Sequence, residues 1–375
     1  MDMNSKPKWI LSATGLAMLA MASGVAGQEV AEAGKLEAAG AHFEVKKAEP
    51  LSVVLEGAPF QGGLDSAMNA LWTNMAVKAG FPMICAAVLM EADAVLGEAL
   101  VGGAWVDEVT PGGDRAICLA MRLRHYGTLR RLCWAGAELG DCGVEGQPLL
   151  VLAALRRQTD AMRTLLLSGA DPDVRTAQPV LPKLVEEQGL KDLQWHLQRD
   201  RNLTPIMICA AHGDADGVEL LMWAGASQSI YTKVNKRYAI NFASVQGYTY
   251  IMQLLLGRKP GSEAEPRVIV SLSGQKAELY RDGQLVDTTK VSTGRKGYST
   301  PSGTFVITNK HSSWTSTIYH VAMPWFMRLN CGSIGMHAGN IPGYPASHGC
   351  IRLPYAKAKA FFGQLRTGDV VQVVP

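Results

Sequence analysis

The apolar positions of this chain follow two different periods, which change near residue 260. Before that point, runs of small apolar residues alternate with Leu-rich runs at helical spacing, in units of about 33 residues. After it, Val268, Val270 and Leu272 alternate with other residues, which is the two-residue period of a strand. The pattern predicts a multidomain protein, in which an all-α repeat region is followed by a mainly β domain.

The repeats are marked by Gly-Ala pairs at 103–104, 136–137 and 169–170, with a further pair at 225–226. A spacing of 33 resembles that of ankyrin repeats, which form an all-α-type solenoid. The unit from Leu203 to Ala226 fits closely, with a Thr-Pro start, a small-residue inner helix, a turn at Gly213 and a Leu-rich outer helix. We expect four to six ankyrin repeats over residues 63–257, with a truncated copy between 171 and 201. Such stacks serve as passive spacers or as concave protein-binding surfaces, and binding is weakly favoured.

Residues 267–375 are predicted to form a mainly β domain, which follows a linker at residues 258–266. Arg281-Asp-Gly283 predicts the turn of a hairpin whose returning strand runs from 284 to 291. Residues 304–308 and 369–374 are further β-rich runs, and 355–366 predicts one helix that ends at Gly368.

Sixteen residues of this domain, 337–352, contain a thiol, two imidazoles and a guanidinium. Cys350 attacks a carbonyl only as a thiolate, so it needs His337 or His348 to take its proton. Gly349 lets the backbone turn so that amides beside the sulfur face a developing oxyanion. Arg352 offers a planar fork suited to a carboxylate. These residue types predict a cysteine acyltransferase.

The segment Ser347-His-Gly-Cys-Ile-Arg-Leu353 resembles the signature of the L,D-transpeptidase catalytic domain, the YkuD family of peptidoglycan enzymes. Four upstream segments occur in the order that this family uses, and they are residues 268–280, 281–283, 291–294 and 300–305. The resemblance covers about the last third of the chain. It implies a mainly β fold and a role in cell-wall biogenesis and cell shape.

The resemblance also implies the roles of individual residues. Cys350 would attack the carbonyl after the L-centre of a diaminopimelate-type residue in a tetrapeptide stem, and an amine would resolve the thioacyl enzyme. His337 would be the base, with its ring oriented by a backbone carbonyl. The Gly349 and Cys350 amides would bind the oxyanion, while Arg352, with Ser347 and His348, would orient the donor. No metal or organic cofactor is implied.

Several alternatives stay open at this point. Cys350 as a buried structural thiol, or His337, His348 and Cys350 as zinc ligands, are both disfavoured by the polar, flexible neighbourhood and the unfamiliar spacing. Water in place of the amine would give an L,D-carboxypeptidase or hydrolase. An envelope interaction module built on the repeats is the third reading. One departure from the family pattern is the link of nine residues, 338–346, between His337 and Ser347, which leaves the acceptor open.

The amino terminus predicts export. Lys6 and Lys8 precede an apolar run from Trp9 to about Ala22, followed by small residues, so residues 1–27 read as a signal peptide and 28–62 as a low-complexity linker. The apolar run is too short for a stable membrane span. We therefore expect a location in the periplasm or cell wall.

Charge is divided unevenly along the chain. Residues 267–375 hold 12 of the 36 Lys and Arg but only 4 of the 33 Asp and Glu, so their net charge is +8 against −5 for the remainder. A basic domain suits acidic peptidoglycan peptide stems as partners. A nucleic-acid partner is disfavoured, because no aromatic and basic binding motif is present.

Seven cysteines raise the question of disulfides in an exported protein. We expect Cys85, Cys118 and Cys209 to be equivalent core positions of the repeats. Cys133 and Cys142 are candidates to pair across a short loop. A regulatory disulfide between Cys331 and Cys350 is less favoured, since it would disable the nucleophile.

Overall fold

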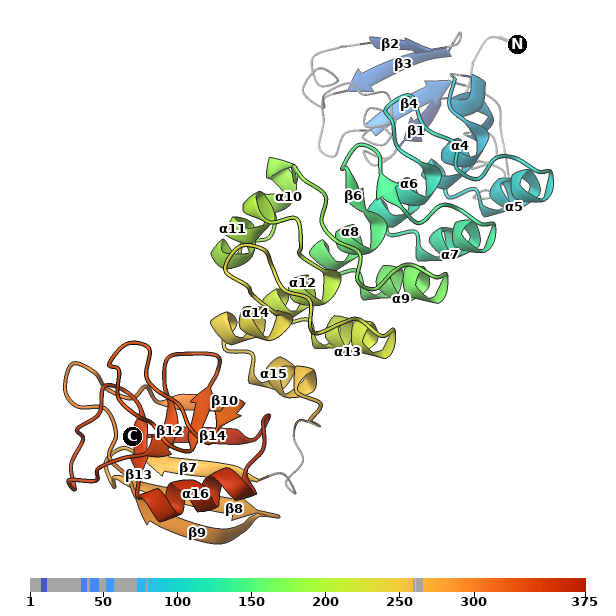
Figure 1. Ribbon diagram of the computed structural model, residues 1–375. Helices are drawn as coiled ribbons and strands as arrows, with labels where there is room; N and C mark the ends of the chain where they lie inside the picture. Colours follow the sequence, from blue (N-terminus) through green and yellow to red (C-terminus); the bar gives the residue numbers. More distant parts are fainter. Residues whose placement is uncertain are drawn as a thin grey trace, which may run out of the picture. The chain divides into compact units, whose positions relative to one another are not determined.

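The structure is a computed structural model that describes residues 73–78, 80–258, 260 and 266–375, together with the backbone of four strands nearer the amino terminus. The chain divides into two compact units, Met1–Asp171 and Pro172–Pro375. Figure 1 labels the helices and strands of both units.

Four short strands lie in the segment predicted to be a leader and linker. They form one antiparallel sheet in the order β1-β4-β3-β2, from β1 (Lys8–Leu11), β2 (Lys35–Ala38), β3 (Ala41–Lys46) and β4 (Ser52–Glu56). The rest of this segment lies outside the described residues. The signal peptide therefore stays a prediction.

The described remainder of the first unit contains three consecutive helix pairs, preceded by a helical segment at residues 73–78. They are α4 (Met83–Leu89) with α5 (Asp93–Val101), α6 (Ala116–Arg122) with α7 (Tyr126–Trp134), and α8 (Leu149–Leu155) with α9 (Thr159–Leu167). Figure 1 shows α4, α6 and α8 in one row and α5, α7 and α9 in another. All seven residues of α8 are buried, whereas α9 buries only Ala161, Met162 and Leu165. The first helix of a pair is apolar all round because it packs between neighbouring helices, which explains the runs of apolar residues. The second helix is amphipathic, which explains the Leu residues at helical spacing.

The recurring glycines end the second helix of each pair. Gly103, Gly136 and Gly169 have φ angles of 82°, 85° and 93°, a left-handed conformation that glycine adopts without steric cost. The chain leaves each helix there and turns toward the next pair. The helix pairs thus repeat with the 33-residue period, while their assignment to the ankyrin class stays a prediction.

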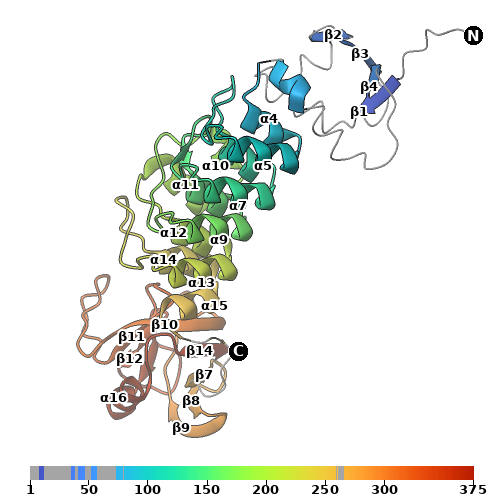
Figure 2. The same ribbon diagram turned by 90° about the vertical axis from the view of Figure 1, so that its right-hand side faces the viewer.

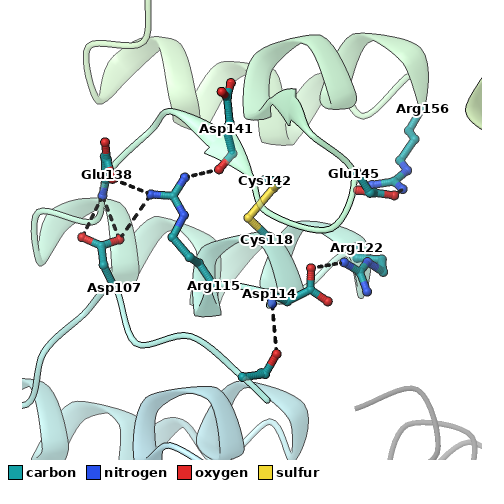
Figure 3. The surroundings of a disulfide bond; sticks show 11 residues. Asp107, Asp114, Arg115, Cys118, Arg122, Glu138, Asp141, Cys142, Glu145 and Arg156 are labelled. Atoms are coloured by element: carbon teal, nitrogen blue, oxygen red, sulfur yellow. Dashed lines mark hydrogen bonds and ion pairs between the residues drawn. A yellow bond between two sulfur atoms is a disulfide. The ribbon is translucent and has the colours of Figure 1, made fainter. Parts of the chain in front are cut away.

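A disulfide joins Cys118 on α6 to Cys142 on β5 (Asp141–Cys142), with the two Cα atoms 5.7 Å apart (Figure 3). Strand β5 pairs with β6 (Gln147–Pro148) in a small hairpin that precedes α8. Cys85, Cys118 and Cys209 are all buried on the first helix of a pair, as expected, although Cys118 is disulfide-bonded. The expected pairing of Cys142 with Cys133 is wrong. The reason is that Cys133 on α7 is buried and faces Ser168 at the end of α9 instead.

Ion pairs surround this disulfide, as Figure 3 shows. Arg115 donates to Glu138 over 2.9 Å and lies 3.8 Å from Asp107, so it ties the loops that follow α5 and α7. Arg122 bonds Asp114 over 2.6 Å at the other side of the sulfur atoms. The disulfide and these pairs together connect the hairpin and the loops of neighbouring helix pairs.

The second unit begins with three more helix pairs. They are α10 (Pro182–Glu186) with α11 (Lys191–Arg199), α12 (Pro205–His212) with α13 (Ala215–Trp223), and α14 (Ala239–Gln246) with α15 (Thr249–Leu255). The segment interpreted as a truncated repeat therefore holds a helix pair of its own. Its first helix is short.

An eight-stranded sheet follows, in the order β13-β12-β11-β10-β14-β7-β8-β9. The strands are β7 (Arg267–Ser271), β8 (Lys276–Arg281), β9 (Gln284–Lys290), β10 (Gly303–His311), β11 (Phe326–Leu329), β12 (Gly335–Ala338), β13 (Ile351–Leu353) and β14 (Val370–Val374). Helix α16 (Tyr355–Gln364) lies next to the strands of this sheet (Figure 2). Its residues Ala358 and Phe361 are buried in the same core as the sheet. The predicted hairpin turn is confirmed, since Asp282 and Gly283, with φ angles of 50° and 72°, join β8 to β9.

The last helix pair is anchored to this sheet. Gln253 on α15 donates to the carbonyl of Gly368 over 3.2 Å, and the Arg258 guanidinium bonds the fully buried carboxylate of Asp369. A Cβ at Gly368 would lie 2.1 Å from Arg258 Cγ, so only glycine leaves room for this arginine. The predicted linker thus begins with a residue that is packed into the β domain.

We expect loss of the disulfide to destabilise the first unit. Replacing Cys118 and Cys142 together with Ala should lower the free energy of unfolding by about 3 kcal/mol, because the unfolded chain is no longer constrained by a loop of 24 residues. Urea denaturation with and without dithiothreitol measures this. The reductant should weaken the wild type and leave the double variant unchanged; equal sensitivity of the two proteins would contradict the pairing.

The buried ion pair generates a second prediction. Arg258→Ala leaves the Asp369 carboxylate buried without its guanidinium, and should lower the free energy of unfolding of the second unit by about 3–5 kcal/mol. The matched control is Arg258→Ala with Asp369→Asn, which removes the buried charge as well and should recover part of the loss. An Arg258→Ala protein as stable as the wild type in urea would show that α15 is not anchored in this way.

Candidate active site

Three of the predicted site residues project from one face of the sheet. In the parallel pairing of β12 with β13, Met336 lies opposite Ile351 and His337 lies opposite Arg352. Met336 and Ile351 are buried in the hydrophobic core. Because successive side chains of a strand alternate between faces, His337 and Arg352 project from the other face, and Cys350, one residue before β13, projects with them. The structure therefore places an imidazole, a thiol and a guanidinium on the same face of the sheet.

The ring of His337 is held in one orientation. Its Nδ1 lies 2.8 Å from the carbonyl oxygen of Ala338, and a carbonyl can only accept, so Nδ1 carries the proton and Nε2 has the free lone pair. The side chain is 6% exposed. Burial, opposed by the contact with the Ala338 carbonyl and assisted by the Arg352 charge, lowers the pKa of His337 to about 4. The imidazole is a neutral base at pH 7.

The Cys350 thiol is partly buried. Burial raises its pKa, and this is opposed by the backbone N–H of Gly335 and by the charges of Arg352 and Arg328. At neutral pH the face therefore carries an uncharged thiol and an uncharged imidazole. A proton must move from sulfur to a base before the sulfur can attack.

Ser347 and Gly349 shape the loop that presents the thiol. The buried Ser347 hydroxyl donates to the Cys350 carbonyl and accepts the Gly349 N–H over 3.1 Å. The φ angle of Gly349 is 108°, and Thr300 donates to its carbonyl over 2.8 Å. The Gly349 amide is thus engaged inside the loop. The structure gives both residues a part in holding the loop, and their roles toward substrate stay predictions.

His348 lies on the outside of the same loop, in a cluster that the sequence did not indicate. Its Nε2 is 2.9 Å from a guanidinium nitrogen of Arg295, its ring stacks on Tyr319 with centroids 4.5 Å apart, and Tyr298 contacts it edge-on at 4.7 Å. A bridge between Gly294 and Ser347 brings Arg295 to this place. No local motif marks these contacts, because they depend on pairing between distant segments.

The structure also shows the surroundings of Arg352 and the state of the two cysteines of this domain. The Arg352 side chain lies against Gly339, where a Cβ would come within 3.0 Å of its Cγ and Cδ. Cys331 and Cys350 are both free thiols.

Within the described ranges, no group of three His, Cys, Asp or Glu could hold a metal ion. In the same ranges, no helix is long and apolar enough to cross a membrane.

Comparisons with known proteins identify this domain. Residues 265–373 match the family model of the YkuD L,D-transpeptidase catalytic domain. A search of curated proteins found no match.

Among solved structures, three similar ones are L,D-transpeptidases. The protein from Mycobacterium smegmatis is 22% identical over 30% of this chain and 59% of its own, with a TM-score of 0.29. The one from Stackebrandtia nassauensis is 27% identical over 34% and 65%, with a TM-score of 0.29. The Enterococcus faecium C442S mutant is 25% identical over 29% and 50%, with a TM-score of 0.27. This chain spans less than two thirds of each, and TM-scores this low support no functional conclusion.

The neutral state of His337 predicts a pH dependence of stability. Its pKa is lower in the folded protein than in the unfolded chain, where it is near 6.5, so the unfolded chain binds the proton first as pH falls. The stabilisation from keeping His337 neutral is present above pH 6.5 and is lost as pH falls toward 4. We expect a loss of about 3 kcal/mol over this interval. Urea unfolding of wild type and His337→Gln at several pH values isolates it; parallel pH profiles would contradict the lowered pKa.

Proposed function

We propose that residues 267–375 act as a peptidoglycan L,D-transpeptidase that forms a thioacyl enzyme at Cys350. The observation that supports this best is the common face of His337, Cys350 and Arg352, with the Nδ1 of His337 bound to Ala338 so that Nε2 is the available base. A thiol, a neutral base and a fixed cation on one face suit acyl transfer from a carboxylate-bearing peptide.

In the proposed reaction, His337 Nε2 takes the proton of the Cys350 thiol as sulfur attacks the carbonyl after the L-centre of a diaminopimelate-type residue in a tetrapeptide stem. The terminal D-alanine leaves as its amine takes the proton back from the imidazolium. An amine of a second stem or of a protein then attacks the thioester and gives a proton to His337. The imidazolium passes this proton to the departing sulfur, so that an amide forms and the thiol is regenerated.

The charge of the domain supports an anionic donor. With a net charge of +8, residues 267–375 would attract carboxylate-rich peptide stems, and the Arg352 fork would orient one of their carboxylates. An amine acceptor gives 3→3 cross-links or protein attachment, whereas water would give a carboxypeptidase. Muropeptide analysis of a deletion strain separates these outcomes: lost cross-links or lost attachment indicates transfer, and accumulated tetrapeptides indicate hydrolysis.

We also infer that the protein works outside the cytoplasm, in the periplasm or cell wall, and that its helix pairs are ankyrin repeats that bind a protein partner. The Cys118–Cys142 disulfide supports export, because such bonds persist in oxidising compartments. The stack of helix pairs at a 33-residue period supports the repeat assignment.

The chemistry is testable with a carbapenem, whose strained lactam carbonyl can be opened by a thiolate. The purified full chain should gain one covalent adduct at Cys350, read by intact-mass spectrometry and peptide mapping. His337→Ala should slow acylation by about 10²- to 10⁴-fold, the usual contribution of a positioned general base. Arg352→Ala should weaken stem-peptide binding more than it slows reaction with the drug.

Two controls accompany this experiment. Cys350→Ala should abolish the adduct, and Cys331→Ala, which removes the other partly exposed thiol of the domain, should leave it intact. An adduct on Cys331, or one that survives the loss of Cys350, would overturn the assignment of the nucleophile.

A further inference from the structure

Arg328 lies on the same face of the sheet as the proposed nucleophile. It sits on β11, where the antiparallel pairing with β12 places it opposite Gly335. Its neighbours Met327 and Leu329 are buried in the core, so the arginine projects from the other face, as His337 does. The parallel register of β12 and β13, continued by one residue, places Cys350 on the other side of Gly335.

The residue between Arg328 and Cys350 in the sheet is Gly335, and no larger residue fits at this position. A Cβ at Gly335 would lie 2.5 Å from both the carbonyl oxygen of Met327 and the ring of Phe326. The strand position between the two residues is therefore bare backbone, and its N–H acts on the Cys350 sulfur. Neighbouring strands lie about 4.8 Å apart, so the Cα atoms of Arg328 and Cys350 are separated by about 10 Å across Gly335.

The guanidinium of Arg328 is fixed in place. Its Nη1 donates to the carbonyl of Gly332 over 2.8 Å and its Nε to the side-chain oxygen of Asn309 over 3.3 Å. The rings of Trp314 and Phe326 lie 5.2 and 5.1 Å from its central carbon. These contacts hold the charge at one position without neutralising it.

No carboxylate in the described part of the chain forms an ion pair with Arg328. Its bonding partners are a carbonyl and an amide, and it is only partly exposed. A half-buried cation without a counter-ion favours an anion formed nearby. The charged groups that act on the Cys350 sulfur are Arg328 from β11 and Arg352 from β13. His337 lies on the same face of β12, and His348, on the loop that carries Cys350, bonds Arg295. None of them is anionic, so the thiolate is the anion that this arrangement would favour.

We propose that Arg328 is a fixed positive charge that stabilises the thiolate of Cys350, and through it the acylation step. In agreement, the charge of Arg328 lowers the pKa of the Cys350 thiol and opposes the effect of burial. The inference rests on the proposed function for its catalytic meaning. Its physical content, a change in the ionisation of one thiol, can be measured without any enzyme assay.

The test is alkylation of the full chain by iodoacetamide between pH 6 and 10, with the rate at Cys350 read by peptide mapping so that it is separate from Cys331. Arg328→Gln should slow alkylation at pH 7.5 by about tenfold, the effect of losing one neighbouring charge, and should move the pH profile upward. Arg328→Lys keeps a charge and should recover most of the rate, which a purely structural role would not explain.

Arg281→Gln is the matched control. Arg281 is an exposed residue of β8 in the same domain that donates to the carbonyl of Gln364, so the variant removes the same charge away from the site and should leave the rate unchanged. Near-ultraviolet circular dichroism establishes that each variant is folded. If Arg328→Gln does not fold, the test uses the wild-type protein at two salt concentrations. Because salt screens neighbouring charges, raising it from 0.05 to 1 M should slow alkylation of Cys350 relative to that of a free cysteine peptide.

The inference is overturned if folded Arg328→Gln is alkylated at the wild-type rate, if Arg328→Lys is as slow as Arg328→Gln, or, where salt is the deciding measurement, if salt has no effect. Failure of the proposed function is distinguishable from this. A protein whose Cys350 alkylation depends on Arg328, but which forms no carbapenem adduct, would retain the charged thiol site and lose the transpeptidase assignment.

Discussion

The register of β11, β12 and β13 is the constraint on which the candidate site depends. With a two-residue period, it places Met327, Met336 and Ile351 in the core and leaves His337, Arg352 and Arg328 on the opposite face. A slip of one residue would exchange the two sets, burying an imidazole and a guanidinium in place of apolar side chains. Core packing therefore determines which side chains share the face of the candidate site, because one register both buries the apolar residues and places the polar ones on that face.

Burial then sets the protonation states. The desolvation that accompanies packing raises the pKa of Cys350 and lowers that of His337, so both are neutral at rest. The uncharged thiol does not react until it becomes a thiolate. Arg328 on β11 and Arg352 on β13 favour the negative charge on the sulfur. The same low-polarity surroundings that suppress the thiolate also make each neighbouring charge more effective.

The helical and β parts of the second unit are joined by more than a linker. Arg258 and Gln253 bond residues 368–369, immediately before β14, which pairs with β10. β10 in turn pairs with β11, the strand that carries Arg328. A continuous set of hydrogen-bonded elements thus connects α15 to the site. In the first unit the disulfide and the ion pairs around Arg115 have a comparable role between neighbouring helix pairs.

The sequence by itself determined the local features of this protein. Its 33-residue period predicted the helix pairs, the Gly-Ala pairs marked their ends, Arg281-Asp-Gly283 predicted a hairpin turn, and the motif around Cys350 indicated a transpeptidase domain that the family match supports. Each of these signals depends on residues close together in the chain. Only the tertiary structure decided that Cys142 bonds Cys118 rather than Cys133, and that Arg328 and Arg295 lie beside the site. These contacts join distant segments through strand register and helix stacking, which the spacing of residues along one chain does not encode.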